Sequence, residues 1–351
     1  MKKVLILSTA CLLLIGCQQA GSEPAELIEK PKPITTHTAP PLGHADGMAP
    51  LDDDIVMPPE DGMIIHSPLD ALIPVGVDLP WKYQGVSIEG NYADAEVVQI
   101  DDRTWRMYYS VQPEIEGNKL ELYSATSTDG VNWTTEDGVR KEFSTFADVI
   151  RLDDGTWRMY FQNMQEIKSA ISTDGLTWTD EEGSRLTRNE SSELEGDNIA
   201  SPSTMRLDDG TYVMVYRGEI EEKYREDVPH RATETLLWAR SSDGLTFEKQ
   251  GVAVSSDSDL YLGKLDGNEW VEWTDGTWRL YYWSYGGVYY VTFDGTAFSD
   301  PEVAEVVFTT LGEYAHEEMP VTPGDPSIAN INGDWYMYFG QKDGIHYAKY
   351  E

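Results

Sequence analysis

From about residue 94 to the C-terminus, apolar and polar positions alternate along the chain with a period of two. One element recurs five times, in which an acidic or glycine turn precedes aromatic or Met residues alternating with smaller or polar ones; its copies are QIDDRTWRMYYS, RLDDGTWRMYFQ, RLDDGTYVMVYR, EWTDGTWRLYYW and NINGDWYMYFG. Such alternation on both sides of a tight turn predicts a β-hairpin. The aromatic residues that align across the copies are Trp105, Trp157, Tyr212, Trp278 and Trp335.

A second element alternates with the first and reads SATSTDGVNWT, SAISTDGLTWT and ARSSDGLTFEK, with a worn copy in VTFDGTAFSD. Its S-x-D-G turn predicts a third and a fourth strand, so two hairpins make one four-stranded blade. Five such units predict an all-β protein, a five-bladed β-propeller. We expect the Ser and Asp of these turns to satisfy backbone groups and the aromatic residue to pack between blades.

The last repeat stops after its third strand, whereas a matching fourth strand, LPWKYQGVSI at residues 79–88, precedes the first repeat. This segment resembles LTFEKQGVAV, which completes the third unit. We therefore expect the ring to be closed by an N-terminal strand that pairs with the strand around His346–Tyr350 and completes the last blade. Such pairing hides two sheet edges.

The N-terminal part of the chain predicts export. Residues 1–17, MKKVLILSTACLLLIGC, combine two lysines, a short apolar run and a final cysteine, as in a signal peptide. The ending LIGC resembles the lipobox of bacterial lipoproteins, which implies lipidation at Cys17 and anchoring of an exported protein to a membrane in the cell envelope or at the cell surface. An ordinary secretion signal is the alternative. Residues 18–73, rich in Pro and acidic residues, predict a disordered tether, and residues 74–351 the propeller.

Charge narrows the classes of partner. The chain has 62 acidic and 26 basic side chains, for a formal net charge of −36. Such a surface repels phosphate backbones and favours solubility, so we expect no nucleic-acid partner, and we expect a monomer. The sequence contains no phosphate-binding loop, nucleotide fingerprint or zinc spacing.

Aligning the predicted inner strands on the turn aromatic brings two sets of residues to common levels. The first level holds Asp94, Phe146, Ser201, Gly267 and Asp325, and the second, two residues later, holds Glu96, Asp148, Ser203, Glu269 and Ser327. Converging carboxylates are costly unless they perform acid–base work or hold a cation. The alternative is that they hydrogen-bond inner-strand amides or face water along the axis.

Five blades with an aspartate opening the first inner strand resemble the clan of arabinanases, β-xylosidases, invertases and levansucrases, and most of all the family 43-type glycoside hydrolases. The resemblance spans about residues 75–351. It implies that Asp94 in NYADAEVV is the general base and Asp148 in FADVIRL the modulator of its pKa. Blade three has Ala200 and Ser201 where the resemblance implies a glutamate acid. TPGDPSI places Asp325 where a histidine near a central cation is usual.

The general acid is therefore left open between Glu219, in the approach to a long loop of blade three, and Glu269 on blade four. Candidates for sugar binding are Arg217, His230, Trp270, Trp283 and Tyr285. Arg217 alternatively forms an ion pair with a nearby carboxylate. A Ca²⁺ or Na⁺ ion along the axis, near Asp325, is a further expectation, since hard cations prefer oxygen ligands.

Two functions follow as expectations. The first is an exported, lipid-anchored glycoside hydrolase that acts on a neutral polysaccharide or oligosaccharide. The second is a non-catalytic propeller that binds glycans or serves as a scaffold at the cell surface. Hydrolysis needs two carboxyl groups on either side of the glycosidic bond.

Overall fold

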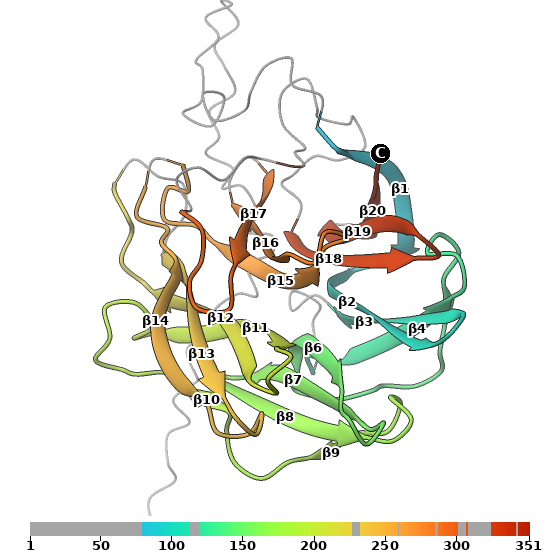
Figure 1. The fold of residues 1–351 in the computed structure, drawn as a ribbon, viewed down its shortest axis with the longest axis horizontal. Coiled ribbons are helices and arrows are strands. Elements are labelled where there is room, and N and C mark those ends of the chain that lie inside the picture. Colours follow the sequence, from blue (N-terminus) through green and yellow to red (C-terminus); the bar gives the residue numbers. More distant parts are fainter. Residues whose placement is uncertain are drawn as a thin grey trace, which may run out of the picture. The chain divides into compact units, whose positions relative to one another are not determined.

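The structure is a computed structural model that describes residues 79–111, 119–226, 232–258, 260–284, 287–300, 307, 324–341 and 343–351. These residues form the five-bladed all-β propeller that the repeats predict, with the blades arranged around a central axis (Figure 1). Cys17, the signal peptide at 1–17 and the tether at 18–73 lie outside the described residues. No helix of the described chain is long and apolar enough to cross a membrane.

Each blade is an antiparallel sheet numbered outward from the axis. Blade one contains β2 (Tyr92–Asp101), β3 (Thr104–Val111), β4 (Leu122–Ser127) and β5 (Thr134–Thr135). Blade two contains β6 (Thr145–Arg151), β7 (Trp157–Asn163), β8 (Glu166–Ser172), β9 (Thr179–Asp180) and β10 (Leu186–Thr187), of which the last two both pair with β8. Blade three contains β11 (Asn198–Arg206), β12 (Tyr212–Ile220), β13 (Thr233–Ser241) and β14 (Glu248–Val254).

The last two blades depart from this plan. Blade four has three strands, β15 (Asp266–Glu272), β16 (Trp278–Ser284) and β17 (Gly287–Phe293), and only a bridge from Phe293 to Phe298 where the worn repeat occurs. Blade five contains β18 (Gly324–Ile331), β19 (Asp334–Gln341), β20 (Gly344–Tyr350) and, at its outer edge, β1 (Trp81–Glu89). In this outer pair Trp81 lies opposite Tyr350 and Glu89 opposite Gly344.

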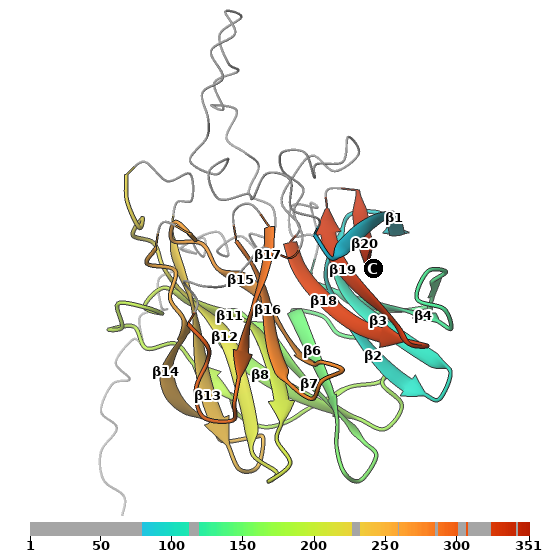
Figure 2. The same ribbon diagram turned by 45° about the horizontal axis from the view of Figure 1, so that its top comes forward.

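The inner strands β2, β6, β11, β15 and β18 contact one another in that cyclic order, and β18 returns to β2. Figure 2 shows β18 and β2 side by side, as does Figure 1. We call the axis that these strands surround the central shaft, and the end at which they begin the shaft mouth. Apolar side chains fill the spaces between blades, so the core is divided into five clusters.

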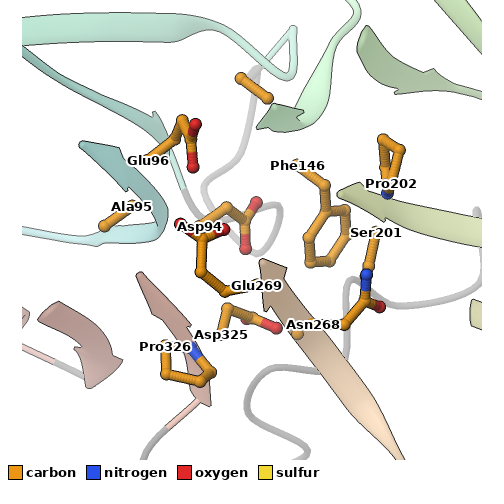
Figure 3. Close-up of a pocket in the computed structure, with 12 residues that line it drawn as sticks. Asp94, Ala95, Glu96, Phe146, Ser201, Pro202, Asn268, Glu269, Asp325 and Pro326 are labelled. Carbon is orange, nitrogen blue, oxygen red and sulfur yellow. The ribbon is translucent and has the colours of Figure 1, made fainter. Parts of the chain in front are cut away.

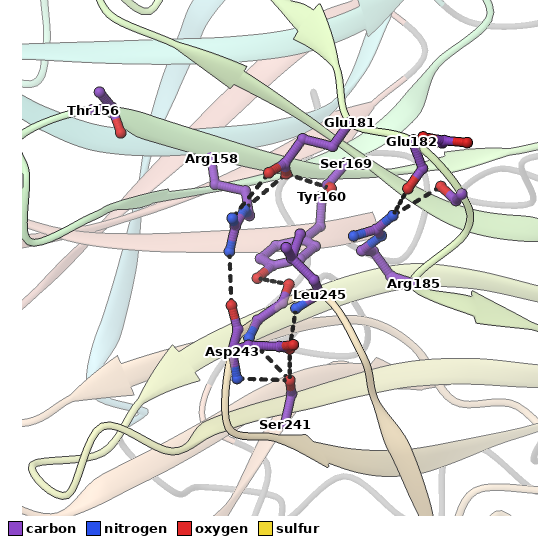
Figure 4. Close-up of polar contacts among 12 residues, drawn as sticks. Thr156, Arg158, Tyr160, Ser169, Glu181, Glu182, Arg185, Ser241, Asp243 and Leu245 are labelled. Carbon is purple, nitrogen blue, oxygen red and sulfur yellow. Dashed lines mark hydrogen bonds and ion pairs between the residues drawn. The ribbon is translucent and has the colours of Figure 1, made fainter. Parts of the chain in front are cut away.

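The S-x-D-G turns hold neighbouring blades together at the rim opposite the shaft mouth. In blade three, Ser241 Oγ accepts hydrogen bonds from two turn amides, and Asp243 Oδ1 accepts those of Leu245 and the following residue at 2.8 Å. The freed carbonyl of Gly244 accepts a hydrogen bond from Tyr160 Oη of blade two at 2.8 Å (Figure 4).

The same contact recurs from Tyr108 to Gly175 and from Tyr338 to Gly130. The turn aromatics Trp133, Trp178 and Phe247 pack edge-on against these tyrosines. The expected structural role of the turns is confirmed.

Candidate active site

All five inner strands are distorted at the same level of the shaft mouth. Each has a register irregularity where it begins, between Ala93 and Glu96 in blade one and at the equivalent positions elsewhere. The residues at this level have left-handed φ angles; they are Asp94 (54°), Phe146 (50°), Ser201 (47°), Gly267 (54°) and Asp325 (50°). Only glycine adopts such angles without strain, and strained residues tend to gather at functional sites.

The bulge residues surround a cavity of about 30 Å³ at the shaft mouth, enough for a water molecule. The predicted first level is thus confirmed, since all five of its residues line this cavity. Figure 3 shows the side chains of Asp94, Glu269 and Asp325 pointing into it. A side chain at Gly267 would collide with the backbone of Asp325, so blades four and five approach each other most closely here.

Asp94 is a buried carboxyl on β2 that accepts a hydrogen bond from Ser110 Oγ, on β3, at 2.7 Å. Burial raises its pKa to about 6, although hydrogen bonds from Ser110, from the side chain of Asp325 and from the Phe146 amide partly offset this effect. A carboxyl that exchanges its proton near neutral pH is suited to general base catalysis.

Asp325 is the companion of Asp94 across the join between the first and last blades. Its Oδ1 accepts a hydrogen bond from Trp283 Nε1 at 3.2 Å. Burial raises its pKa well above the ordinary value, and repulsion by Asp266 and Asp94 adds to the effect. Asp325 therefore keeps its proton to higher pH than Asp94, and the hydrogen bond between the two carboxyls favours ionisation of Asp94.

The second level forms a closed ring of hydrogen bonds between blades. Each member accepts a bond from the amide that follows the equivalent position of the next blade; the pairs are Glu96 with Val149, Asp148 with Thr204, Ser203 with Trp270, Glu269 with Ile328, and Ser327 with Val97. Asp148 and Glu269, the predicted modulator and one candidate acid, are both members of this ring. The alternative of hydrogen bonds to inner-strand amides is therefore realised for them.

The three acids of this ring favour their protonated forms. Burial raises the pKa of Asp148 to about 7 and the pKa of Glu96 and Glu269 well above the ordinary value, with mutual repulsion adding to the latter two. Among the described residues, no three His, Cys, Asp or Glu side chains are arranged to hold a metal ion. This geometry does not fit a shaft cation, so no catalytic step is derived through one, and the expected Ca²⁺ or Na⁺ stays a prediction.

A buried cluster of charges lies beside the shaft mouth on blades three and four. Arg217 has 1% of its side chain exposed and contacts Asp266, Glu219 Oε2 at 3.3 Å and Glu234 Oε1 at 3.2 Å. Lys264 Nζ pairs with Glu234 and lies 3.4 Å from Asp266 Oδ2. Two cations facing three carboxylates leave a net negative charge, so the alternative of an ion-paired Arg217 is the one that the structure contains.

The cluster is connected to the aspartate pair. Asp266 Oδ1 accepts hydrogen bonds from Ser201 Oγ at 2.7 Å and from the Gly267 amide at 2.8 Å, which are both bulge residues. Lys264 Nζ lies 4.5 Å from the ring centre of Trp283, whose indole donates to Asp325. Asp266, Glu234 and Lys264 escaped the sequence analysis because no motif marks them and tertiary packing alone brings them together.

Glu219 is the candidate acid that the structure places outside the second-level ring. Its carboxyl lies on β12 at the shaft-mouth end and contacts Arg217 and, at 3.4 Å, Asn198 Nδ2. Burial raises its pKa, although the positive charge of Arg217 opposes this. A carboxyl that holds its proton in this way is suited to general acid catalysis.

The predicted sugar-binding residues have different positions. Trp270 packs against Phe293 at 5.6 Å in the core of blades three and four, because its neighbour Glu269 points to the opposite face of the sheet. Trp283 is buried beside Asp325. His230 and Tyr285 lie outside the described residues.

No protein-family model matches the chain, and no curated protein sequence matches it. Solved structures do match its fold. A structure of a BT0996 RGII complex is 14% identical with a TM-score of 0.61, and the match covers 78% of this protein and 92% of that one. A thermostable family-43 glycoside hydrolase is 12% identical with a TM-score of 0.57, and the match covers 76% and 91%.

A third structure comes from the GH130 family of mannoside phosphorylases, described as containing glycoside hydrolases that target β-1,2-mannosidic linkages in Candida mannan. It is 15% identical with a TM-score of 0.56, and the match covers 80% of this protein and 96% of that one. The described chain therefore has the five-bladed propeller fold that occurs in glycoside hydrolases, as the repeats and the first inner-strand aspartate predict.

Proposed function

We propose that this protein is a glycoside hydrolase that cleaves a neutral or near-neutral polysaccharide or oligosaccharide at the shaft mouth. The observation that carries the proposal is the buried pair of Asp94 and Asp325, which share a cavity in strained backbone on a fold found in glycoside hydrolases. The strongly negative charge of the chain favours an uncharged substrate over an anionic one.

The proposed reaction breaks the bond between the anomeric carbon and the leaving oxygen. Asp94 removes a proton from a water molecule, whose oxygen bonds to the anomeric carbon, and Glu219 gives its proton to the leaving oxygen. Asp325 lies too close to Asp94 to stand on the far side of the bond, since the two catalytic carboxyls must be at least about 5 Å apart. Asp325 therefore acts as a positioning residue that sets the pKa of Asp94.

The first experiment compares the full-length protein with its Asp94→Asn variant on aryl pentosides, aryl hexosides and plant or algal polysaccharides. We expect turnover of at least one substrate and a loss of about 10²- to 10⁴-fold in the variant, the usual effect of removing a general base. Equal turnover by both proteins would refute the assignment of Asp94. Binding of polysaccharide by both without turnover would favour the non-catalytic glycan-binding alternative.

The acid is tested with leaving groups of different quality. A good leaving group such as dinitrophenolate departs without protonation, whereas a sugar alcohol does not. Glu219→Gln should therefore lose far more activity on an oligosaccharide than on a dinitrophenyl glycoside. Equal losses on both substrates would exclude Glu219 as the proton donor, and Glu269→Gln is the matched control from the second-level ring.

Export and anchoring belong to the same proposal. We propose that the signal at residues 1–17 directs the chain out of the cytoplasm and that lipid on Cys17 holds it at a membrane. Cys17→Ser should move the protein from the membrane fraction to the soluble fraction and abolish labelling with a radioactive fatty acid. A variant that stays membrane-bound would contradict the anchor without affecting the enzymatic proposal.

A further inference from the structure

Left-handed backbone is concentrated around the shaft mouth. Nine non-glycine residues of the described chain have φ between 47° and 60°, and four of them are the bulge residues of the site. Three others gather between blades one and two: Leu120, Phe143 and Met164. Turn chemistry does not account for these three, because it favours Gly, Asn or Asp at such angles.

The three residues lie on the rim of the shaft mouth. Phe143 is three residues before Phe146, which lines the cavity, and its amide donates to Lys119 O at 2.8 Å. The tip of the next hairpin holds Met164. Asn163 Nδ2 donates to Phe143 O at 2.8 Å, so the two tips are fixed together.

Phe143 and Met164 are the two most exposed large apolar residues of the described chain, at 57% and 55%. An exposed Phe in strained backbone gains little from burial, so folding alone gives no reason for it. An ion pair flanks the rim, because Lys119 Nζ lies 3.0 Å from the carboxylate of Glu142. An apolar surface beside a few polar groups is the usual composition of a small-ligand site.

We infer that Phe143 and Met164 form a platform that binds a second sugar unit of the saccharide whose reacting bond lies at Asp94. This inference rests on the proposed function. The apolar C–H face of a sugar ring packs on the Phe143 ring, while its hydroxyl groups reach the Lys119–Glu142 pair. The occupant is a saccharide because the platform continues from the cavity on the same rim, through Phe146.

The test measures retention of the full-length protein in native gels that contain arabinan, xylan or mannan. We expect at least one polysaccharide to retard the wild type, and Phe143→Ala and Met164→Ala to weaken that retention about fivefold. Hydrolysis of an aryl glycoside with a single sugar should change less than about twofold, because it does not reach the platform. Val131→Ala is the matched control, since Val131 is 39% exposed on the opposite rim.

Phe143→Gly separates a binding role from a structural one. Glycine relieves the left-handed strain, so the variant should unfold at the same or a higher temperature than the wild type while its retention falls. The inference is overturned by unchanged retention of Phe143→Ala, by equal losses in retention and in single-sugar hydrolysis, or by no retention of the wild type. Retention needs no turnover, so a failure of the platform is distinct from an Asp94→Asn variant that remains active.

Discussion

The carboxyls of Asp94 and Asp325, from the first and the last blade, share one buried site, and each affects the ionisation of the other. Their partners differ: Asp94 accepts from the Ser110 hydroxyl, and Asp325 from the Trp283 indole. The join between the two ends of the propeller sequence is therefore also the place where the proposed chemistry occurs.

The pH dependence of activity follows from this pair. Asp94 must be ionised to act as a base and its pKa is raised to about 6, so kcat/KM should rise with pH through about 6. Ser110→Ala removes a hydrogen bond that stabilises the ionised form, which should move this rise to higher pH. A pH–rate profile of both proteins checks the prediction, and an unmoved acid limb in Ser110→Ala would contradict it.

Stability should depend on pH through the shaft acids. Asp148 has a folded pKa of about 7 against an ordinary value of 3.8, so the folded state binds more protons between these values. Its contribution favours folding fully below pH 4 and is lost as the pH rises through 7, a change on the order of 4 kcal/mol at most. Asp148→Asn keeps an oxygen for the Thr204 amide and should flatten this decline.

Urea unfolding at pH 4.5 and pH 8 measures this effect, and Asp129→Asn serves as the control of opposite sign. Turn hydrogen bonds lower the pKa of Asp129 to about 2, so its contribution is lost as the pH falls. A wild type equally stable at both pH values would contradict protonated shaft acids.

The inter-blade hydrogen bonds at the opposite rim should affect stability alone. Tyr160→Phe removes the hydroxyl that donates to the Gly244 carbonyl, which should lower the free energy of unfolding by about 1–3 kcal/mol and leave kcat unchanged. Tyr108→Phe makes the equivalent change one blade earlier. Since the two bonds are separate, the double variant should show the sum of the two losses in thermal or urea unfolding. A change in kcat would contradict a purely structural role.

The edge strand of blade five should be required for the whole ring. Trp81 on β1 is buried, with its ring 5.4 Å from Tyr350 and 6.5 Å from Tyr281. Trp81→Ala should destabilise the protein by about 3–5 kcal/mol, whereas Val86→Ala, at a 38% exposed position of the same strand, should cost less than about 0.5 kcal/mol. Urea unfolding measures both, and equal effects would contradict the packing argument.

The repeats predicted the blades and the first level of the site, because a fixed number of residues separates each turn from the start of its inner strand. The left-handed backbone at that level was not predictable, since only Gly267 among its residues suggests such an angle. The role of Arg217 depended on partners without a motif, Glu234 and Lys264, which come from other strands and loops. Trp270 was misplaced because a bulge precedes it and fixes which face it occupies.

The pairing of β1 with β20 also sets the timing of folding. A chain made from its N-terminus produces β1 first, but the partner of Trp81 is Tyr350, so this strand stays unpaired until synthesis is almost complete. Asp94 likewise meets Asp325 only then. The proposed active site therefore cannot assemble on a partly synthesised chain, and a protein exported before it folds would become active only at its destination.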